Sequence, residues 1–398
     1  MTKRVWIETY GCQMNVADSE LILGTLAREG YDVASEPDGA DVLLVNTCAV
    51  RDNAEQRVIG RVGELQRHKR PGTVLGVVGC MAQRLGPILL ERVPKVDLVV
   101  GPDGYRNLPE LLAHAAEGGR VADVAYRDRE HYEDLPQLRQ PGPPAFVTVQ
   151  RGCDYRCTFC IVPTTRGPER SRPLADVVRE VDGLVATGVT EVTLLGQTVN
   201  SWNDGEHDFA DLLRAVSTVD GIRRVRFTSP YPTDFTPRVI AAIAELPAVC
   251  EHVHLPVQSG ADSVLKRMLR RYRRAEYLSV MASLRDAVPG ITFSTDIIVG
   301  FPGETDAEFE ETLSLVAEAG FDDAYTFKYS VREGTPAVRI PHHVDDDVAS
   351  ERLARLIETA REQTRRRNIA RVGEVHELLI DRPARRGDLV LGRSRQNF

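Results

Sequence analysis

Short apolar runs alternate with longer mixed segments through the first 117 residues. A continuous apolar run such as 41–47 is typical of a strand that is buried on both faces of a sheet. Segment 18–30 instead has helical apolar spacing, an Asp–Ser start and a terminal glycine. Alternating strands and helices predict a parallel-sheet α/β domain over residues 1–117. The expected strands are 4–10, 41–47, 73–79 and 96–101.

Residues 118–143 break this pattern, because they are polar and then rich in proline. Such a composition predicts a linker between two domains. From residue 144 the alternation resumes, and six β/α units predict a partial (β/α)6 TIM-like barrel over residues 144–370. A parallel barrel carries its chemistry at the C-terminal ends of its strands. The expected barrel strands are 145–150, 191–197, 224–229, 252–257, 291–300 and 323–330.

The last segment, residues 371–398, has two strand-like stretches, 372–380 and 387–394, after a charged helix at about 345–370. So short a segment cannot bury a core of its own. It therefore either packs on the barrel or is the first part of an incomplete small C-terminal β domain. The expected fold class is thus α/β, with a parallel-sheet domain, a partial barrel and this short β segment.

Composition and charge limit the cellular compartment and the classes of partner that the protein can have. The apolar fraction of 42% and charged fraction of 27% are ordinary for a soluble protein. No stretch approaches the ~18 apolar residues of a membrane span, and the N-terminus lacks the apolar region of a signal peptide. We therefore expect a cytoplasmic protein with no membrane partner. The net charge of −8 argues mildly against a nucleic-acid partner, although four arginines surround Tyr272 and form either a solvated helix face or a binding surface.

Cysteine spacing gives the first chemical signal. In a reducing compartment, clustered cysteines indicate metal binding or catalysis rather than disulfides. Cys153, Cys157 and Cys160 follow the first barrel strand in a C-x3-C-x2-C loop. Soft thiolates suit iron–sulfur clusters and zinc, and three ligands leave a four-iron cluster with one open iron, to which S-adenosylmethionine can bind. A zinc loop with a distant fourth ligand is the alternative; the strand-end position and Phe159 favour the cluster.

Three further cysteines, Cys12, Cys48 and Cys80, each follow a predicted strand of the first domain. Parallel strands end at one edge of their sheet, where ligands bind. We therefore expect these cysteines to converge and to hold a second cluster, again with three protein ligands. Zinc, or three unrelated buried thiols, are the alternatives. Cys250 has no partner at a metal-binding spacing and is interpreted as a core or near-surface thiol.

Two glycine-bearing strand ends lie on the same predicted barrel face as the cysteine loop. Gly196 would let backbone approach a ligand closely, and Gln197 beside it could bind polar groups of that ligand. Gly300 and Glu304 end another predicted strand. Such strand ends are either simple turns or contacts to the cofactor, and we interpret these four residues as cofactor-binding.

Taken together, these motifs resemble the methylthiotransferases of the radical S-adenosylmethionine superfamily. The similarity is greatest to the bacterial branch that modifies N6-isopentenyladenosine in tRNA. The motifs that carry the resemblance are YGCQMNVADSE (10–20), VNTCAVRDNAEQR (45–57), GCMAQR (79–84), RGCDYRCTFCIVPTTRGPERSRP (151–173), GQTVNSW (196–202), HLPVQSGADSVLKRMLRRY (254–272), TDIIVGFPGET (295–305) and YSVREGTPA (329–337).

The resemblance implies two [4Fe-4S] clusters and S-adenosylmethionine as cofactors. Residues 153, 157 and 160 would hold the radical-generating cluster, and residues 12, 48 and 80 an auxiliary cluster that carries sulfur. The reaction implied is addition of a methylthio group to C2 of N6-isopentenyladenosine at position 37 of tRNA. It requires an external electron donor and a sulfur donor. The last segment resembles the first part of a small β-rich RNA-binding domain.

The resemblance also implies contacts to RNA. Anticodon-loop bases can be splayed out and stacked on aromatic side chains, while arginines bind the loop phosphates. The residues expected to make these contacts are Arg166, Arg170, Arg172, Arg271 and Tyr272.

Two other functions remain open at this point. A sister methylthiotransferase would act on threonylcarbamoyladenosine in tRNA or on an aspartate of a ribosomal protein. A protein of another class would be a non-catalytic iron–sulfur or zinc protein that binds RNA or senses redox state.

Overall fold

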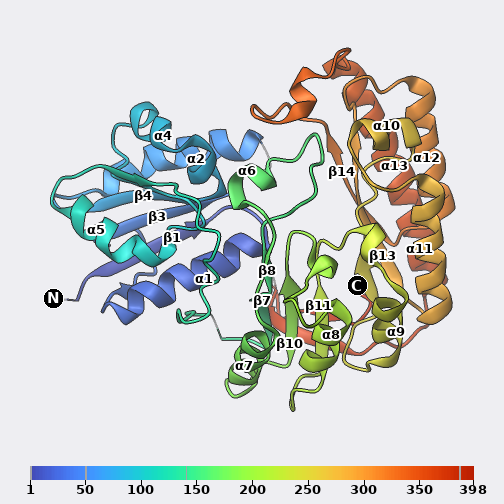
Figure 1. Cartoon of the computed structure of the whole chain (residues 1–398), viewed down its shortest axis with the longest axis horizontal. Helices are drawn as coiled ribbons and strands as arrows, with labels where there is room; N and C mark the ends of the chain where they lie inside the picture. The colour runs from blue at the N-terminus through green and yellow to red at the C-terminus, as the bar shows by residue number, and fades with distance from the viewer. Residues whose placement is uncertain (1, 50–51, 140, 385–386) are drawn as a thin grey trace. The chain divides into compact units, whose positions relative to one another are not determined.

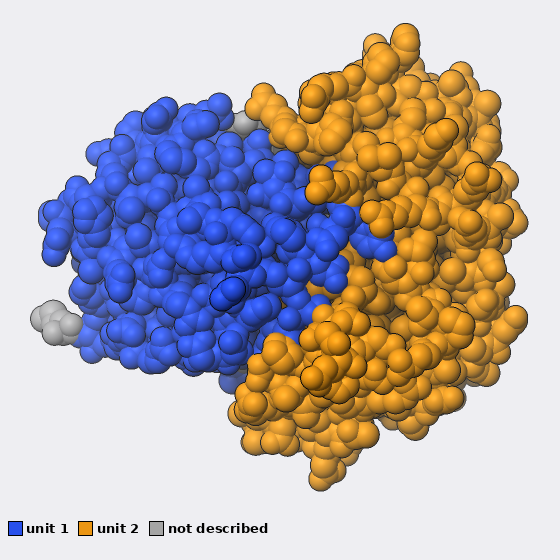
Figure 2. Space-filling view, viewed as in Figure 1, with its two compact units in different colours: residues 1–141, 151–155, 160–172 blue, residues 142–150, 156–159, 173–398 orange. Residues whose placement is uncertain are grey.

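The computed structural model describes residues 2–49, 52–139, 141–384 and 387–398. The chain divides into two compact units, which are coloured separately in Figure 2. Unit 1 comprises Met1–Pro141, Arg151–Tyr155 and Cys160–Arg172, and unit 2 comprises Gly142–Gln150, Arg156–Phe159 and Pro173–Phe398.

Unit 1 is built on a parallel sheet of six strands in the order β2-β1-β3-β4-β5-β6 (Figure 1). The central strands β3 and β4 are buried along their whole length, as their continuous apolar sequences predict. The strands are β1 (Arg4–Thr9), β2 (Asp32–Val33), β3 (Val42–Thr47), β4 (Val74–Gly79), β5 (Leu98–Val100) and β6 (Val121–Asp123). The helices are α1 (Gln13–Arg28), α2 (Asp52–Leu65), α3 (Cys80–Leu85), α4 (Pro87–Arg92), α5 (Leu108–Ala116) and α6 (Val162–Arg166), with short 3-10 turns at Gln66–His68 and Tyr105–Asn107.

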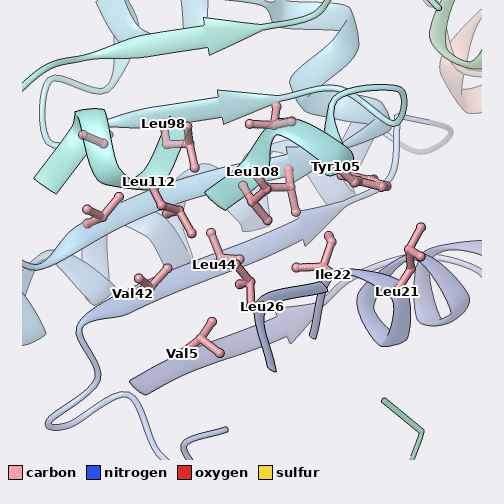
Figure 3. Close-up of a cluster of buried hydrophobic side chains, with 14 of the residues drawn as sticks. Val5, Leu21, Ile22, Leu26, Val42, Leu44, Leu98, Tyr105, Leu108 and Leu112 are labelled. Atoms are coloured by element: carbon pink, nitrogen blue, oxygen red, sulfur yellow. The ribbon is translucent and has the colours of Figure 1, made fainter. Parts of the chain in front are cut away.

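Side chains of β3 alternate between two cores, because successive residues of a strand point to opposite faces. Leu44 packs with Leu26 of α1 and Leu112 of α5 on one face, as Figure 3 shows. Leu43 packs on the other face in a cluster that includes Val62 of α2. Helices on both faces of a parallel sheet are the arrangement expected of an α/β domain.

The segment predicted to be a linker, residues 118–143, packs on unit 1 in its described part. β6 pairs with β5 as the sixth strand of the sheet. Tyr132 and Leu135 belong to the same core cluster as Leu44, and the Leu138 N–H donates to the Glu20 carbonyl at 2.9 Å. The linker prediction is therefore corrected. Its polar residues are engaged in ion pairs, such as that of Arg139 with Glu20 at 3.2 Å, rather than in solvated coil.

Unit 2 contains two three-stranded parallel sheets, in the orders β11-β10-β7 and β12-β13-β14 (Figure 1). An isolated parallel bridge joins Val225 of β11 to Val249, which lies just ahead of β12. The strands are β7 (Pro144–Thr148), β10 (Glu191–Leu195), β11 (Arg224–Phe227), β12 (His252–His254), β13 (Thr292–Val299) and β14 (Asp323–Lys328). The helices are α7 (Leu174–Val185), α8 (Phe209–Ser217), α9 (Pro237–Glu245), α10 (Asp262–Arg267), α11 (Arg274–Ala287), α12 (Asp306–Ala319) and α13 (Asp346–Ala370), with 3-10 turns at Val199–Ser201, Pro232–Asp234 and Pro336–Arg339.

This alternation of parallel strands and helices confirms the predicted α/β class. The strands lie within a few residues of the predicted ranges, and those of unit 2 have helices between them in sequence. None of the helices in the described part of the chain is long and apolar enough to cross a membrane.

The C-terminal segment packs on unit 2, which is one of the two outcomes expected from its sequence. Strands β15 (Leu378–Pro383) and β16 (Val390–Ser394) form an antiparallel ribbon. At the start of β11, Arg224 Nη1 donates to the Arg393 carbonyl at 2.8 Å and Arg226 Nη2 to the Ser394 carbonyl at 2.6 Å. At the start of β13, the Thr292 hydroxyl donates to the Gln396 carbonyl at 2.7 Å. The segment therefore contacts the N-terminal ends of the strands.

The packing of residues 130–138 on α1 predicts the response of Gly24 to substitution. A Cβ at Gly24 would lie 2.1 Å from the Pro136 carbonyl oxygen, so Gly24→Ala must push this segment away. We expect the free energy of unfolding to fall by about 1–3 kcal/mol, as measured by urea denaturation. Gly183→Ala in α7 is the matched control, since a Cβ there meets nothing within 4 Å, and it should raise stability by about 0.5–1 kcal/mol. Equal responses of the two variants would contradict the packing.

Candidate functional site

Three cysteines of unit 1 lie at the carboxyl edge of its sheet, as their sequence positions predict. β1, β3 and β4 are neighbouring parallel strands. Cys12 caps the N-terminus of α1 shortly after β1, Cys48 directly follows β3, and Cys80 begins α3 directly after β4. A Cβ built on Gly11 would lie 3.0 Å from the Cys48 Cβ, so the loop of Cys12 contacts Cys48. All three cysteines thus follow neighbouring strands of this sheet, and their joint binding of one cluster stays a prediction.

A buried amide network fixes the backbone around Cys12 and Cys48. Asn15 Oδ1 accepts from the Cys12 N–H at 3.3 Å, and Asn15 Nδ2 donates to the Thr47 carbonyl at 3.1 Å. Asn46 Nδ2 donates to the Asn15 carbonyl at 2.7 Å and to the Ser19 hydroxyl at 2.8 Å. Asn15 and Asn46 are fully buried, so their bonds fix these strand ends.

Gly79 permits the approach of β4 to this network. Its φ is +95°, a conformation that favours glycine. A Cβ there would lie 2.5 Å from Asn46 Oδ1 and 2.6 Å from the Thr47 carbonyl oxygen. Glycine therefore lets Cys80 start α3 beside the strand end that carries Cys48.

Behind the three cysteines, Asp18 joins two buried arginines. Arg166 Nη2 lies 2.7 Å from one Asp18 oxygen, and Arg151 Nη1 lies 3.0 Å from the other. Burial opposes ionisation of Asp18, but the two guanidinium groups outweigh it and hold the pKa of this carboxyl below its usual value. Two cations and one anion leave a net positive charge in the interior.

The excess charge is directed toward the cysteines. Arg166 Nη1 is buried and has no hydrogen-bond partner in the described part of the chain. Burial raises the pKa of the Cys80 thiol, and Arg166 acts in the opposite direction by favouring the thiolate. An unsatisfied buried donor beside Cys80 fits an anionic group held by thiolates.

The second cysteine loop follows β8 (Gln150–Arg151), and its residues fall in both units. In unit 1, the Cys153 N–H donates to the Gly167 carbonyl at 3.1 Å. In unit 2, the Thr158 N–H donates to the Met268 carbonyl at 3.0 Å, and the Phe159 ring packs edge-on against Phe301 at 6.4 Å. Residues 151–155 and 160 of this loop thus belong to unit 1, and residues 156–159 belong to unit 2.

Within unit 2, Cys157 has a charged neighbour that the sequence interpretation did not assign to the site. Its thiol is 7% exposed, and Arg270 Nη1 lies 3.3 Å from its sulfur. Arg270 belongs to the arginine group around Tyr272, where sequence alone could not distinguish a surface face from a buried contact.

Residues 12, 48 and 80 are predicted to hold an iron–sulfur cluster, with zinc as the alternative. Among the described residues, no three His, Cys, Asp or Glu side chains come close enough together to hold a single metal ion. Ligands of one zinc ion all lie within about 2.3 Å of it, whereas the thiolates of a four-iron cluster bind different irons and stand further apart. Thiolates at residues 12, 48 and 80 are suitable ligands for either group.

Two family models match the chain. The model described as uncharacterized protein family UPF0004 matches residues 4–101, and that of the Radical SAM superfamily matches residues 147–316. The tRNA-2-methylthio-N(6)-dimethylallyladenosine synthase of Sorangium cellulosum is 48% identical over 95% of this chain and 82% of that protein. A protein with the same name from Alkalilimnicola ehrlichii is 44% identical over 100% of this chain and 91% of that protein.

The chain belongs to the tRNA-2-methylthio-N(6)-dimethylallyladenosine synthase family. The family resemblance inferred from the motifs is thereby confirmed. The radical S-adenosylmethionine methyltransferase TsrM from Kitasatospora setae has a similar structure, with a TM-score of 0.63 and 16% identity, over 85% of this chain and 77% of that one. At this identity, the likeness shows the fold alone.

In this member of the family, the residues predicted to bind cofactor occupy two different environments. Gly196 directly follows β10, and a Cβ there would lie 2.7 Å from Gln150 Oε1. Gln197 Oε1 is buried and has no hydrogen-bond partner among the described residues, so this acceptor is free for a ligand.

The other two residues form a turn after β13. The Gly300 N–H donates to Glu304 Oε2 at 2.7 Å, and Arg352 Nη1 of α13 lies 2.9 Å from the same oxygen. Glu304 is 4% exposed, and burial raises the pKa of its carboxyl although Arg352 opposes the shift. These bonds give Glu304 a role in closing the turn.

Of the five residues predicted to contact RNA, four are buried. Arg166 pairs with Asp18 as described, and Arg170 Nη2 lies 3.0 Å from Asp103. Arg172 is 6% exposed, and Tyr272 is 4% exposed with its hydroxyl directed to the Val257 carbonyl at 2.9 Å. Arg271 is exposed.

The last cysteine, Cys250, is a core thiol. It is 2% exposed, and burial raises its pKa to about 11. Of the motif at 45–57, residues 50 and 51 lie outside the described residues.

The buried charge group predicts that Asp18 is required for stability. Asp18→Asn keeps the shape of the side chain but leaves Arg151 and Arg166 without a charge partner. We expect the free energy of unfolding to fall by about 3–5 kcal/mol, as measured by urea denaturation near pH 7. Asp176→Asn is the control, since Asp176 pairs with a largely exposed Arg179, and it should cost at most about 1 kcal/mol.

The free energies of unfolding of wild type and Asp18→Asn should depend differently on pH. The folded-state pKa of Asp18 lies below its unfolded value of about 3.9. Its contribution is therefore present above that pH and is lost as the pH falls toward the folded pKa. The difference between wild type and Asp18→Asn should narrow below about pH 4. A difference that stayed constant down to the lowest pH at which the protein is folded would contradict this assignment.

Proposed function

We propose that this protein adds a methylthio group to C2 of N6-isopentenyladenosine (also called dimethylallyladenosine) at position 37 of tRNA. The proposal depends on one combination of observations. The chain carries two separate cysteine triads, and it is 48% identical over 95% of its length to a tRNA-2-methylthio-N(6)-dimethylallyladenosine synthase. The electropositive strand edge around Cys12, Cys48 and Cys80 supports this proposal.

The six cysteines would hold two [4Fe-4S] clusters, one on each triad. When bound, the cluster on residues 153, 157 and 160 with S-adenosylmethionine supplies an adenosyl radical, and the cluster on residues 12, 48 and 80 supplies sulfur. The C2–H bond of adenine is a poor acid, so side chains acting as acids or bases have little to offer. The task of the protein is then to bind, orient and electrostatically tune these groups.

Among the predicted cofactor contacts, Gln197 Oε1 and Glu304 Oε1 are buried acceptors without a hydrogen-bond partner in the described part of the chain. We assign Gln197 Oε1 to a donor group of S-adenosylmethionine, such as its ammonium. Gly196 beside it provides the close backbone approach, since the space for a side chain is already filled by Gln150. Gly300 and Glu304 act through the turn that they close.

For the RNA substrate, Arg271 is the predicted contact that reaches solvent. Its backbone N–H donates to the Tyr231 hydroxyl at 2.9 Å, which fixes the backbone while leaving the side chain exposed. A fixed cation suits a loop phosphate. An external electron donor and a sulfur donor complete the set of partners, and we place the reaction in the cytoplasm, where tRNA is found.

The function is tested by mass spectrometry of tRNA nucleosides from a deletion strain. We expect methylthio-isopentenyladenosine to disappear and isopentenyladenosine to accumulate. The wild-type gene should restore the product, whereas Cys153→Ala or Cys48→Ala should reduce it to background. Cys250→Ala is the matched control and should restore the product fully. Loss of the methylthio group from threonylcarbamoyladenosine instead would support the sister enzyme.

Iron analysis of anaerobically purified protein separates the enzyme from the zinc alternative. Two four-iron clusters correspond to about eight iron and eight sulfide per chain. A variant that lacks Cys12, Cys48 and Cys80 should retain about half of each. One zinc per chain and no cleavage of S-adenosylmethionine would contradict the proposal.

Arg271→Gln tests the contact to tRNA. One lost contact to a single-stranded phosphate should weaken tRNA binding and reduce the slope of log K against log salt by about 0.7, as measured by filter binding from 50 to 200 mM salt. Iron content should stay unchanged. Arg179→Gln on α7 is the control, because Arg179 is exposed like Arg271, and its binding should match wild type. An unchanged slope in Arg271→Gln would rule out the contact.

A further inference from the structure

Arg270 is held against Cys157 by a set of contacts within unit 2. Its Nη1 lies 3.3 Å from the Cys157 sulfur. Of the other two guanidinium nitrogens, Nε donates to the Tyr272 hydroxyl at 2.9 Å, and Nη2 donates to the Pro256 carbonyl at 3.4 Å. Each nitrogen of the guanidinium group therefore has a partner, and one of these partners is a predicted cluster ligand.

Two tyrosine rings fix the orientation of this guanidinium group. Its central carbon lies 4.3 Å from the centre of the Tyr231 ring and 5.0 Å from that of Tyr272. The two rings contact each other edge-on at 5.6 Å. Cation–π contacts of this kind favour a positive charge at this position. A flexible surface arginine would not be confined in this way.

The backbone just before Arg270 is strained. Leu269 has a φ of +55°, which is unusual for a bulky residue. Its own side chain is 53% exposed, so the conformation gains no burial for Leu269. Strained backbone persists where the surrounding structure enforces it and is concentrated at functional sites. The turn at Leu269 brings Arg270 inward.

The charge of Arg270 has no carboxylate partner among the described residues. Several buried arginines elsewhere in the chain do have one, because an unpaired buried cation is costly. The contacts of Arg270 are instead two aromatic rings, a tyrosine hydroxyl, a carbonyl and the Cys157 sulfur. Among these groups, the sulfur is the one that carries a full negative charge when it acts as a metal ligand. Examples of such buried pairs are Arg166 with Asp18, Arg170 with Asp103 and Arg352 with Glu304.

We propose that Arg270 is a positioning residue that raises the reduction potential of the cluster held by Cys153, Cys157 and Cys160. It donates a charge-assisted hydrogen bond to the Cys157 sulfur, and its charge stabilises the reduced cluster, which carries one more electron than the oxidised one. Hydrogen bonds to cluster sulfurs and nearby charge are recognised controls of such potentials. This proposal rests on the proposed function, since it takes Cys157 as a cluster ligand.

The test measures a midpoint potential rather than activity. A background variant with Cys12, Cys48 and Cys80 changed to alanine leaves one cluster to observe. Redox titration followed by electron paramagnetic resonance then compares this background with the same protein carrying Arg270→Gln. We expect the reduced-to-oxidised ratio at a given potential to fall about tenfold, which is a shift of about −59 mV for a one-electron couple.

Two further variants control the experiment. Lys266→Gln on α10 removes the same charge from an exposed position close in sequence, and it should leave the potential within error of the background. Arg270→Lys keeps the charge but loses the planar fork, so it should give a smaller shift in the same direction. If Arg270→Gln does not fold, the midpoint potential of Arg270→Lys is the measurement that decides the proposal.

The possible failures are distinguishable. An unchanged potential in both Arg270 variants, with iron content intact, would overturn the role of Arg270 and leave the proposed function standing. Equal shifts in Arg270→Gln and Lys266→Gln would overturn it as well, because the effect would then be one of net charge. A background variant that bound no four-iron cluster would contradict the proposed function, and this inference with it.

Discussion

The site of unit 1 depends on one constraint, which is that neighbouring parallel strands end at the same edge of a sheet. Cys12, Cys48 and Cys80 are distant in sequence, and they lie at one edge of the sheet because β1, β3 and β4 are adjacent and run in the same direction. An antiparallel order would have sent one of them to the opposite edge. The buried strands thus set the geometry of the site, and the conformational freedom of Gly79 completes it.

Buried cations set the electrostatic potential near the unit 1 cysteines. Asp18 anchors Arg151 and Arg166 so that their charge can lie in the interior behind residues 12, 48 and 80. A carboxylate bonded to two arginines neutralises one positive charge and leaves the other available to an anionic ligand. Asp18 therefore has two roles. It stabilises the fold by pairing with two buried arginines, and it sets the net positive charge of the interior near the cysteines.

The strand-end positions of the cysteines could be inferred from sequence because the signals are local or follow from strand periodicity. Cys153, Cys157 and Cys160 lie in one loop, and each of the other three follows an apolar run that sequence identifies as a strand. The positions of the strands followed from the same patterns. Cys250 was expected to be a core or near-surface thiol because it has no partner at a metal-binding spacing, and it is buried.

The roles of the arginines could not be predicted in this way. Sequence shows that Arg166 and Arg170 are charged, and charged residues are usually exposed. Whether a charge is buried depends on a partner far along the chain, such as Asp18 or Asp103. Residues 118–143 were misinterpreted as a linker for the same reason, because a polar composition hides ion pairs that pack a segment against a domain.

The arginines near the two triads differ in what stabilises their positive charge. Arg166 is bonded to Asp18, so part of its charge is already balanced before any ligand binds. Arg270 is stabilised by aromatic rings, which attract a cation without neutralising it. A charge that is held but not neutralised acts on its remaining neighbour at full strength, and in unit 2 that neighbour is the Cys157 sulfur. Tyrosine rings thus suit this position better than a carboxylate, which would have cancelled the effect on the ligand.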